Sequence, residues 1–336
     1  MAELPPFETG KLRGQNEVER AMVILSYFGH AYVWGAPEVP QSIPVSLAVP
    51  WAAVAGRLGR PPVLSYASYA LYNWKRFDRR GPVALGNIAL LQNFQGGLDE
   101  EWFILVHVDI EAEAAPALAA LHPAQAAVIE KDSDALGRLL ATVAAALEAM
   151  CQTLERMPEN CDPYIYYSRV RPYIHGWKDN PALPGGIVYE GVAAYGGKPQ
   201  KFRGETGAQS AIIPSLDAAL GIEHKDDPLK TYLMELRDYM PPPHRNFIKS
   251  LEAGASIRRY VRENHRGRPF LREAYNACIG LIERFRSRHF EYAARFIQKQ
   301  YQQRASNPTD VGTGGTPFLL YLRKHRDETV AHLILQ

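Results

Sequence analysis

The segment LREAYNACIGLIERFRSRHFEYAARFI, residues 271–297, decides the fold class, because its apolar side chains recur in steps of three, four and seven residues. That spacing places them along one face of a long helix. Continuing the pattern from Phe285 brings the next inward position to His289, where an aliphatic side chain would be expected. The segment therefore predicts a buried helix that carries an imidazole toward the protein interior.

Most of the remaining chain has the same helical periodicity, and the alternating patterns typical of strands are nearly absent. The one ambiguous run, residues 104–110, continues into an alanine-rich stretch that favours helix. The sequence thus predicts an all-α protein, with a small N-terminal helical domain over residues 1–97 and a large helical bundle domain over residues 98–336. Helices are expected at 15–34, 64–79, 100–120, 133–156, 163–176, 207–221, 227–239, 244–253, 269–300 and 315–334.

The composition is that of an ordinary globular protein, with 46% hydrophobic and 22% charged residues and a net charge of +2. This charge gives no reason to expect nucleic acid as a partner. The N-terminus lacks the apolar core of a secretory signal, and no apolar run reaches the length of a membrane span. Three dispersed cysteines without a CxxC pair suit a reducing compartment, so we expect a cytoplasmic location.

Two histidines are candidate metal ligands. A neutral imidazole at His289, on a rigid helix in an apolar slot, suits a haem iron, although a hydrogen-bonded core histidine fits the same pattern. His107 and Asp109 have the spacing of a facial non-haem iron site. On a helix, however, residues two apart point about 200° away from each other, which disfavours that alternative.

Arg171 and two glycine-rich loops are candidate ligand-binding elements. Arg171 lies in the largely aromatic stretch 166–177, where its planar guanidinium suits a carboxylate, either of a ligand or of another residue. The loop GTGGTP, residues 312–317, lacks the pattern of a nucleotide-binding loop and could instead close over a ligand. A second such loop, FRGETGAQS, covers residues 202–210.

Taken together, these stretches resemble the indoleamine 2,3-dioxygenases, haem enzymes that insert both atoms of dioxygen into the indole ring of tryptophan. The resemblance runs along almost the whole chain in family order. Its motifs are AYVWG (31–35), LAVPWAAVAGRLGRPPVLSYASYALYNWKRFD (47–78), HGWKDNPALPGGIVYEG (175–191), GAQSAIIPSLDAALGI (207–222), ELRDYMPPPHRNFIKSLE (235–252), LREAYNACIGLIERFRSRH (271–289) and GTGGT (312–316).

The resemblance implies specific roles for residues of this sequence. His289 would be the proximal ligand of the iron in haem b, ferrous in the active state, with Arg286 and Asp217 supporting it. Arg171 would hold the substrate carboxylate, with His107 as a second catalytic residue. The remaining substrate-binding residues would be Tyr66, Tyr69, Phe103, Tyr166, Tyr167, Thr206, Gly207, Thr313 and Gly314.

Four departures from the family pattern stand out. The chain begins inside the small domain of its relatives, so part of that domain is expected to be missing. The paired pocket aromatics, Tyr166 and Tyr167, are both tyrosine, and Glu205 with Thr206 replaces smaller residues in the glycine-rich loop. His107 stands where the animal enzymes have serine and the tryptophan 2,3-dioxygenases have histidine. Since an imidazole can accept a hydrogen bond from the indole N–H, His107 is expected to orient the substrate.

The function that the resemblance implies is cleavage of the indole C2–C3 bond of L-tryptophan, or a close indoleamine, by O2 to give N-formylkynurenine. A related haem enzyme that oxidises a tryptophan derivative in secondary metabolism is the alternative within the same chemistry. A haem-binding sensor without turnover is a third possibility, which the carboxylate-binding Arg171 and the GTGGT loop disfavour. The sequence leaves the oligomeric state open.

Overall fold

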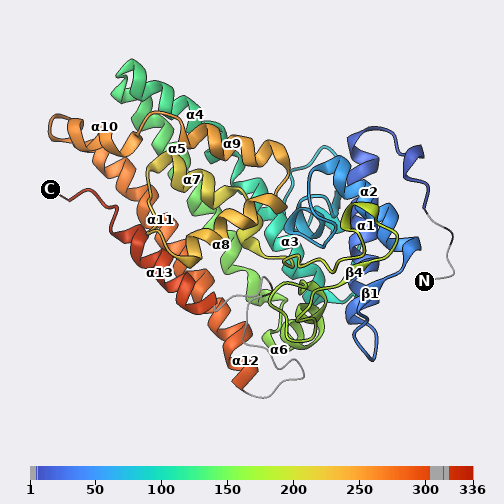
Figure 1. Cartoon of the computed structure of the whole chain (residues 1–336). Coiled ribbons are helices and arrows are strands. Elements are labelled where there is room, and N and C mark those ends of the chain that lie inside the picture. The colour runs from blue at the N-terminus through green and yellow to red at the C-terminus, as the bar shows by residue number, and fades with distance from the viewer. Residues whose placement is uncertain (1–4, 6, 303–312, 314–317, 336) are drawn as a thin grey trace.

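The computed structural model describes residues 5, 7–302, 313 and 318–335, and helices make up most of this part of the chain (Figure 1). Helix α5 (Ser133–Glu155) packs against both α4 (Ala115–Glu130) and α11 (Pro269–Ala293), and α13 (Phe318–Val330) packs on α11. Helix α3 (Leu98–Glu113) lies between this bundle and the N-terminal pair α1 (Gly14–Trp34) and α2 (Val45–Leu58) (Figure 1). The predicted all-α class is confirmed.

Shorter elements complete the fold. Two pairs of very short strands tie loops together, β1 with β4 in parallel and β2 with β3 antiparallel. The bounds are α6 Pro163–Ile165, α7 Ile212–Leu220, α8 Pro228–Leu236, α9 Pro242–Glu252, α10 Ile257–Asn264, α12 Lys299–Gln302, β1 Ser42–Ile43, β2 Trp74–Arg76, β3 Ile88–Leu90 and β4 Val188–Tyr189.

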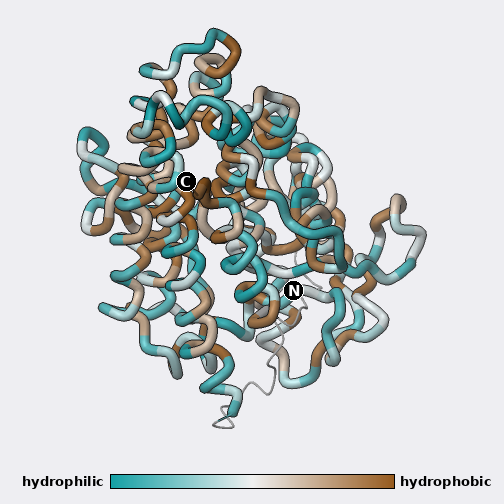
Figure 2. Tube along the Cα trace, turned by 90° about the vertical axis from the view of Figure 1, so that its left-hand side faces the viewer, coloured by the Kyte–Doolittle hydropathy of each residue, from teal (hydrophilic) through white to brown (hydrophobic). Residues whose placement is uncertain are grey.

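The long helix predicted from residues 271–297 is confirmed as α11. Leu271 and Cys278 are fully buried, and Leu281 and Phe285 pack against the same hydrophobic core. Colour alternates along the helical turns in Figure 2, as expected when each helix has one hydrophobic and one hydrophilic face. Among the described residues, no helix combines the length and apolar composition needed to cross a bilayer.

Several predicted boundaries are wrong. The expected helix at 64–79 ends at Leu71, because the buried Asn73 side chain donates hydrogen bonds to the Tyr27 hydroxyl and the Gln92 carbonyl and so fixes a turn. The expected helix at 100–120 is divided at Ala114 into α3 and α4, with Pro116 in the first turn of α4.

Two helices were not predicted. Helix α2 contains Pro50 in its interior, which disguises the helical pattern, and it ends at Gly59 with φ of 64°, a left-handed conformation that glycine adopts readily. Helix α10 is capped by Ser256, whose side chain accepts a hydrogen bond from the Arg259 N–H.

Three turns of the described chain are π-helical, with i→i+5 hydrogen bonding: η2 (Ala67–Leu71), η4 (Tyr166–Val170) and η10 (Ala294–Gln298). Each was expected to be regular helix. Such turns are rare and frequently occur at functional sites. Here they carry Tyr69, Tyr166 with Tyr167, and Phe296, which are aromatic residues that gather around one region of the interior.

The division at Gly97 remains a proposal. Gly97 precedes α3 with φ of 98°, so the chain does change direction there. The hydrophobic cores nevertheless cross this point: Tyr27 and Tyr69 share a cluster with Ile104 and Val108. Tyr66 and Tyr69, from before the proposed boundary, therefore pack against residues of the site described below, whose cavity is lined by residues from after it.

Candidate functional site

A cavity of about 220 Å³ lies where α3, α8, α11, α13 and the loop after Arg203 meet. Its wall is mainly apolar, with a few polar side chains that converge on it. The lining residues are Phe103, His107, Leu154, Met157, Tyr166, Glu205, Thr206, Gly207, Ala208, Leu229, Tyr232, Leu233, His289, Tyr292, Ala293, Phe296, Ile297, Thr313, Tyr321, Leu322 and His325. An apolar cavity with a few polar groups is the usual form of a cofactor or substrate site.

His289 projects from α11 into this cavity. The His289 side chain is exposed to the open space of the cavity. Desolvation by the surrounding protein, followed by the charge of His107, lowers the pKa of its imidazole to about 4. The ring is therefore neutral near pH 7 and keeps a lone pair that can ligate a metal.

His107 borders the same cavity from α3. Its Nδ1 lies 2.7 Å from the carbonyl oxygen of Phe103, one turn earlier, and the two rings lie 4.7 Å apart. Burial lowers the pKa of His107, although the Phe103 hydrogen bond opposes this effect. Asp109 instead approaches the Thr153 hydroxyl of α5, so the facial iron site proposed for His107 and Asp109 is not assembled.

The predicted aromatic residues fall into two groups. Phe103 and Tyr166 form part of the cavity wall, and their ring centroids lie 4.5 Å apart. Tyr66, Tyr69 and Tyr167 are buried next to them without bordering the cavity. Tyr66 meets the His107 ring edge to face at 6.0 Å, and Tyr69 lies 6.3 Å from Phe103.

Arg171 is fully buried, and it does not border the cavity. Its guanidinium carbon lies 5.4 Å from the ring centroid of Tyr167. The Arg171 charge lowers the pKa of His175 after the larger effect of burial, and it partly offsets the burial that raises the pKa of Tyr166. That Arg171 holds a substrate carboxylate stays a prediction.

Thr313 contacts the second glycine-rich loop at the cavity. The Thr313 hydroxyl donates a 2.5 Å hydrogen bond to the Glu205 carbonyl, and the Thr206 side chain accepts one from the Ala208 N–H at 3.4 Å. Thr206, Gly207 and Thr313 all line the cavity, whereas Gly314 lies outside the described residues.

Asp217 forms an ion pair with Arg286, which lies three residues before His289 on α11. Arg286 Nη2 donates to Asp217 Oδ2 at 2.6 Å, and His224 Nε2 lies 3.0 Å from the same oxygen. Burial alone would raise the pKa of Asp217, but Arg286 and His224 lower it. Within the described part of the chain, Asp217 makes no hydrogen bond with His289, so support through Arg286, one turn before His289, stays a prediction.

Comparison with known proteins decides the relationship. A profile of the family "Indoleamine 2,3-dioxygenase" matches residues 1–332. The chain belongs to the indoleamine 2,3-dioxygenase family. Indoleamine 2,3-dioxygenase 1 of Rattus norvegicus is 38% identical across 99% of this chain and 84% of the rat protein. The Saccharomyces cerevisiae indoleamine 2,3-dioxygenase is 32% identical across 94% of this chain and 78% of the yeast protein. A 6-hydroxytryptophan 2,3-dioxygenase of Fusarium equiseti is 31% identical across 98% of this chain and 85% of its own length.

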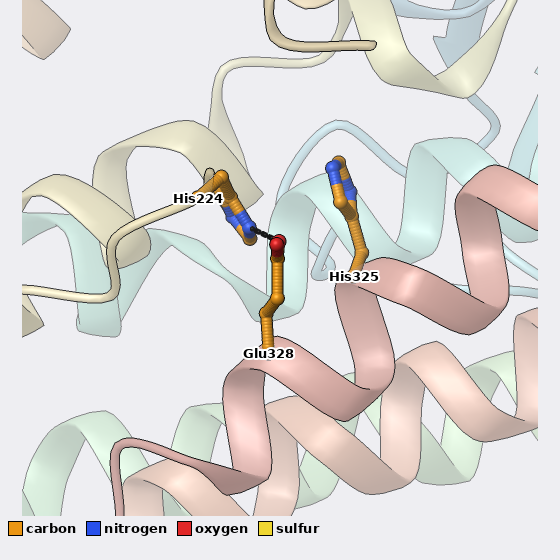
Figure 3. A group of neighbouring side chains, drawn as sticks. All are labelled: His224, His325 and Glu328. Carbon is orange, nitrogen blue, oxygen red and sulfur yellow. Dashed lines mark hydrogen bonds and ion pairs between the residues drawn. The ribbon is translucent and has the colours of Figure 1, made fainter. Parts of the chain in front are cut away.

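This family member also contains a cluster of potential metal ligands, His224, His325 and Glu328 (Figure 3). The geometry does not suit a shared metal. Nδ1 of His224 lies 2.7 Å from Glu328 and Nε2 faces Asp217, so both nitrogens already bind carboxylates. The His224 and His325 rings stack 4.2 Å apart at 26°, and their in-plane lone pairs do not converge. Although burial opposes it, Asp217 raises the pKa of His224, as expected for a protonated ring between two carboxylates.

Sequence reasoning missed two polar residues of this indoleamine 2,3-dioxygenase cavity. His325 lines the cavity, and its Nε2 atom is buried without a hydrogen-bond partner among the described residues. Burial, followed by the charge of His224, lowers its pKa to about 3. Glu205 was noted only as a departure in a glycine-rich loop, and the signal in the sequence was a charged residue at a position where the resemblance leads one to expect a smaller one.

Proposed function

We propose that this chain binds haem b and uses O2 to cleave the indole C2–C3 bond of L-tryptophan, or of a close indoleamine, to give N-formylkynurenine. The single observation that carries the proposal is that neutral imidazoles of His289 and His107 border one largely apolar cavity in an indoleamine 2,3-dioxygenase. Its three cysteines are free and buried, in keeping with the cytoplasm as the proposed location.

The residues present fit a haem group. His289 offers the nitrogen ligand that haem iron needs, on a long helix that fixes its position. The buried, unpartnered Nε2 of His325 offers a polar contact for a propionate at the same cavity. When bound, ferrous haem supplies the binding and activation of O2, which side chains cannot provide.

The protein's own residues then bind and orient the indole. Phe103 and Tyr166 supply flat apolar contacts for the ring system. His107 accepts the indole N–H, and Thr206, Gly207 and Thr313 close the cavity around the amino-acid end of the substrate. Arg171 holds the substrate carboxylate, and Gly314, which lies outside the described residues, stays a predicted substrate-binding residue.

The test is the visible spectrum of purified, haem-loaded protein, recorded with and without L-tryptophan, followed by product analysis. We expect a Soret band that shifts when L-tryptophan is added, and N-formylkynurenine when the reduced protein meets O2. If haem-replete, reduced protein forms no N-formylkynurenine from L-tryptophan and O2, the proposal is wrong. An unchanged Soret band would instead favour the sensor function.

The second candidate is oxidation of a tryptophan derivative in secondary metabolism. Two observations favour it: the Fusarium relative is named for 6-hydroxytryptophan, and Tyr166, which lines the cavity, carries a hydroxyl group. Competition between L-tryptophan and hydroxylated tryptophans, measured as relative kcat/KM, separates the two candidates.

A further inference from the structure

Glu205 is the acidic residue among the described side chains that line the cavity. It is 4% exposed and shares the wall with Phe103, His107 and Tyr166. Burial is the main cause that raises the pKa of Tyr66, Tyr69 and Tyr166, and the Glu205 carboxyl makes a smaller contribution, which for Tyr66 ranks after Glu111 and for Tyr69 after Tyr27 and Glu100. Glu205 therefore shares the cavity wall with the aromatic residues Phe103 and Tyr166.

No described side chain donates a hydrogen bond or supplies a counter-ion to the Glu205 carboxyl. Burial alone raises its pKa to about 8. An ionised carboxyl that is buried without a cation is costly, so Glu205 is held protonated until a cation reaches it, and a perturbed group of this kind in a cavity is a candidate for ligand binding. The arrangement therefore indicates a ligand that carries a positive charge.

The backbone holds Glu205 in place. Its N–H donates to the Ile174 carbonyl at 3.0 Å, and its own carbonyl accepts the hydrogen bond from Thr313. The preceding Gly204 is packed so closely that a Cβ atom there would lie 2.3 Å from the Gly176 nitrogen. This close packing places Glu205 on a backbone segment adjacent to the one that contains Ile174. Arg171 lies on that second segment, three residues before Ile174.

We propose that Glu205 receives the protonated amine of the substrate and makes the cavity selective for indoles that carry a primary ammonium group. The inference rests on the proposed function and adds a specificity residue to it. Arg171 and Glu205 lie on neighbouring backbone segments, and once Glu205 ionises their opposite charges match the carboxylate and ammonium of an amino acid. His107 would hold the indole end of the same molecule.

Binding of the ammonium group ionises Glu205 and releases a proton. The titratable groups around it do not take up this proton. Burial raises the pKa of Tyr66, Tyr69 and Tyr166 and keeps them neutral, while burial lowers the pKa of His107 and His175. Arg171 stays charged throughout.

The experiment is calorimetric titration of the haem-loaded full chain at pH 7 with three ligands. L-Tryptophan carries both charged groups, tryptamine carries only the ammonium, and indole-3-propionate carries only the carboxylate. The variant Glu205→Gln is expected to weaken L-tryptophan and tryptamine binding about 10-fold to 100-fold, and to change indole-3-propionate binding by less than about twofold. Repeating the titrations in buffers of different ionisation enthalpy is expected to show up to one proton released by the two amines, and none in the variant.

The amide is nearly the same size as the protonated carboxyl that it replaces, so the variant is expected to fold as the parent does. Glu205→Asp serves as the second variant, because it keeps the charge and should retain part of the preference for amines. Equal weakening of all three ligands by Glu205→Gln, or no weakening of any, overturns the inference.

The two proposals fail separately. If the parent protein binds amines through Glu205 yet forms no N-formylkynurenine, the ammonium site stands and the proposed reaction is wrong. If the product forms but Glu205→Gln leaves the amine preference intact, the reaction stands and the role of Glu205 is wrong.

Discussion

The Nδ1 atom of His107 lies 2.7 Å from the carbonyl oxygen of Phe103, and this contact fixes which ring nitrogen carries the proton. A carbonyl oxygen only accepts hydrogen bonds, so Nδ1 must donate. Because burial lowers the pKa of the ring, His107 is neutral, and its Nε2 is left as an acceptor. A neutral acceptor at the cavity is the form that an indole N–H requires.

Replacing His107 with serine is therefore expected to reduce kcat/KM for L-tryptophan about tenfold, the effect of losing one hydrogen bond of roughly 1.4 kcal/mol. Turnover of 1-methyl-L-tryptophan, which lacks the N–H, should be poor in the parent and change less than about twofold in the variant. Comparable turnover of the two substrates by the parent protein would count against this role. Steady-state kinetics with both substrates provides the measurement.

His289→Gly is expected to abolish stable haem binding, because it removes the neutral imidazole on α11 that borders the cavity. Added imidazole should restore a Soret band by occupying the space of the missing ring. His122→Ala is the matched control, since His122 lies on the exposed side of α4 and contacts Ser250. Normal haem content in His289→Gly without imidazole would refute the ligand assignment.

The ion pair between Arg286 and Asp217 is expected to matter for stability. Arg286→Ala removes the cation beside a largely buried carboxylate, which should cost about 3 kcal/mol in the free energy of unfolding. Arg284→Ala, two residues earlier on α11, removes surface pairs with Glu148 and Glu155 and should cost less than about 1 kcal/mol. Urea denaturation of both variants tests the contrast, and equal losses would contradict it.

His30 makes a contribution to stability that depends on pH. Its Nδ1 donates to the Tyr173 carbonyl at 2.7 Å, and its Nε2 accepts from the Leu64 N–H at 2.9 Å, which requires a neutral ring. Burial lowers its pKa to about 3, against the ordinary value of 6.5 in the unfolded chain. The unfolded state therefore binds more protons between these values, and the contribution present above pH 6.5 is lost as the pH falls.

Between pH 7 and pH 5 this loss amounts to about 2 kcal/mol. His30→Gln should remove that part of the pH dependence, because glutamine does not titrate. Unfolding free energies of parent and variant at the two pH values give the comparison. An identical loss in both proteins would show that His30 is not responsible.

The periodicity of the apolar residues was sufficient to predict most of the helices, and the helical placement of His107 and His289 followed from it. The prediction of a helix at 64–79 was wrong because the Asn73 side chain forms hydrogen bonds with residues distant in sequence, which no local pattern reveals. The π-helical turns were not predicted for a similar reason. Their aromatic side chains pack against rings from other elements, and these contacts are not visible in the local sequence.

The candidate site was predicted in part. The family motifs pointed to seven of the residues that border the cavity: Phe103, His107, Tyr166, Thr206, Gly207, His289 and Thr313. They did not indicate that Arg171 and Tyr167 would be packed behind the wall, because burial depends on neighbouring loops. The possible roles of Glu205 and His325 became clear only from the structure. It shows that both line the cavity, and that the Glu205 carboxyl and the His325 Nε2 atom have no hydrogen-bond partner among the described residues.

The three π-helical turns have a consequence for protein engineering. A π turn contains one residue more than an α turn, so all side chains that follow are rotated by about 100° from regular helical register. Deleting one residue in Tyr166–Val170 would convert η4 to ordinary helix and rotate Arg171 relative to the residues that precede the turn. Chain length within these turns, independent of residue identity, is thus a variable through which the shape of the cavity can be altered.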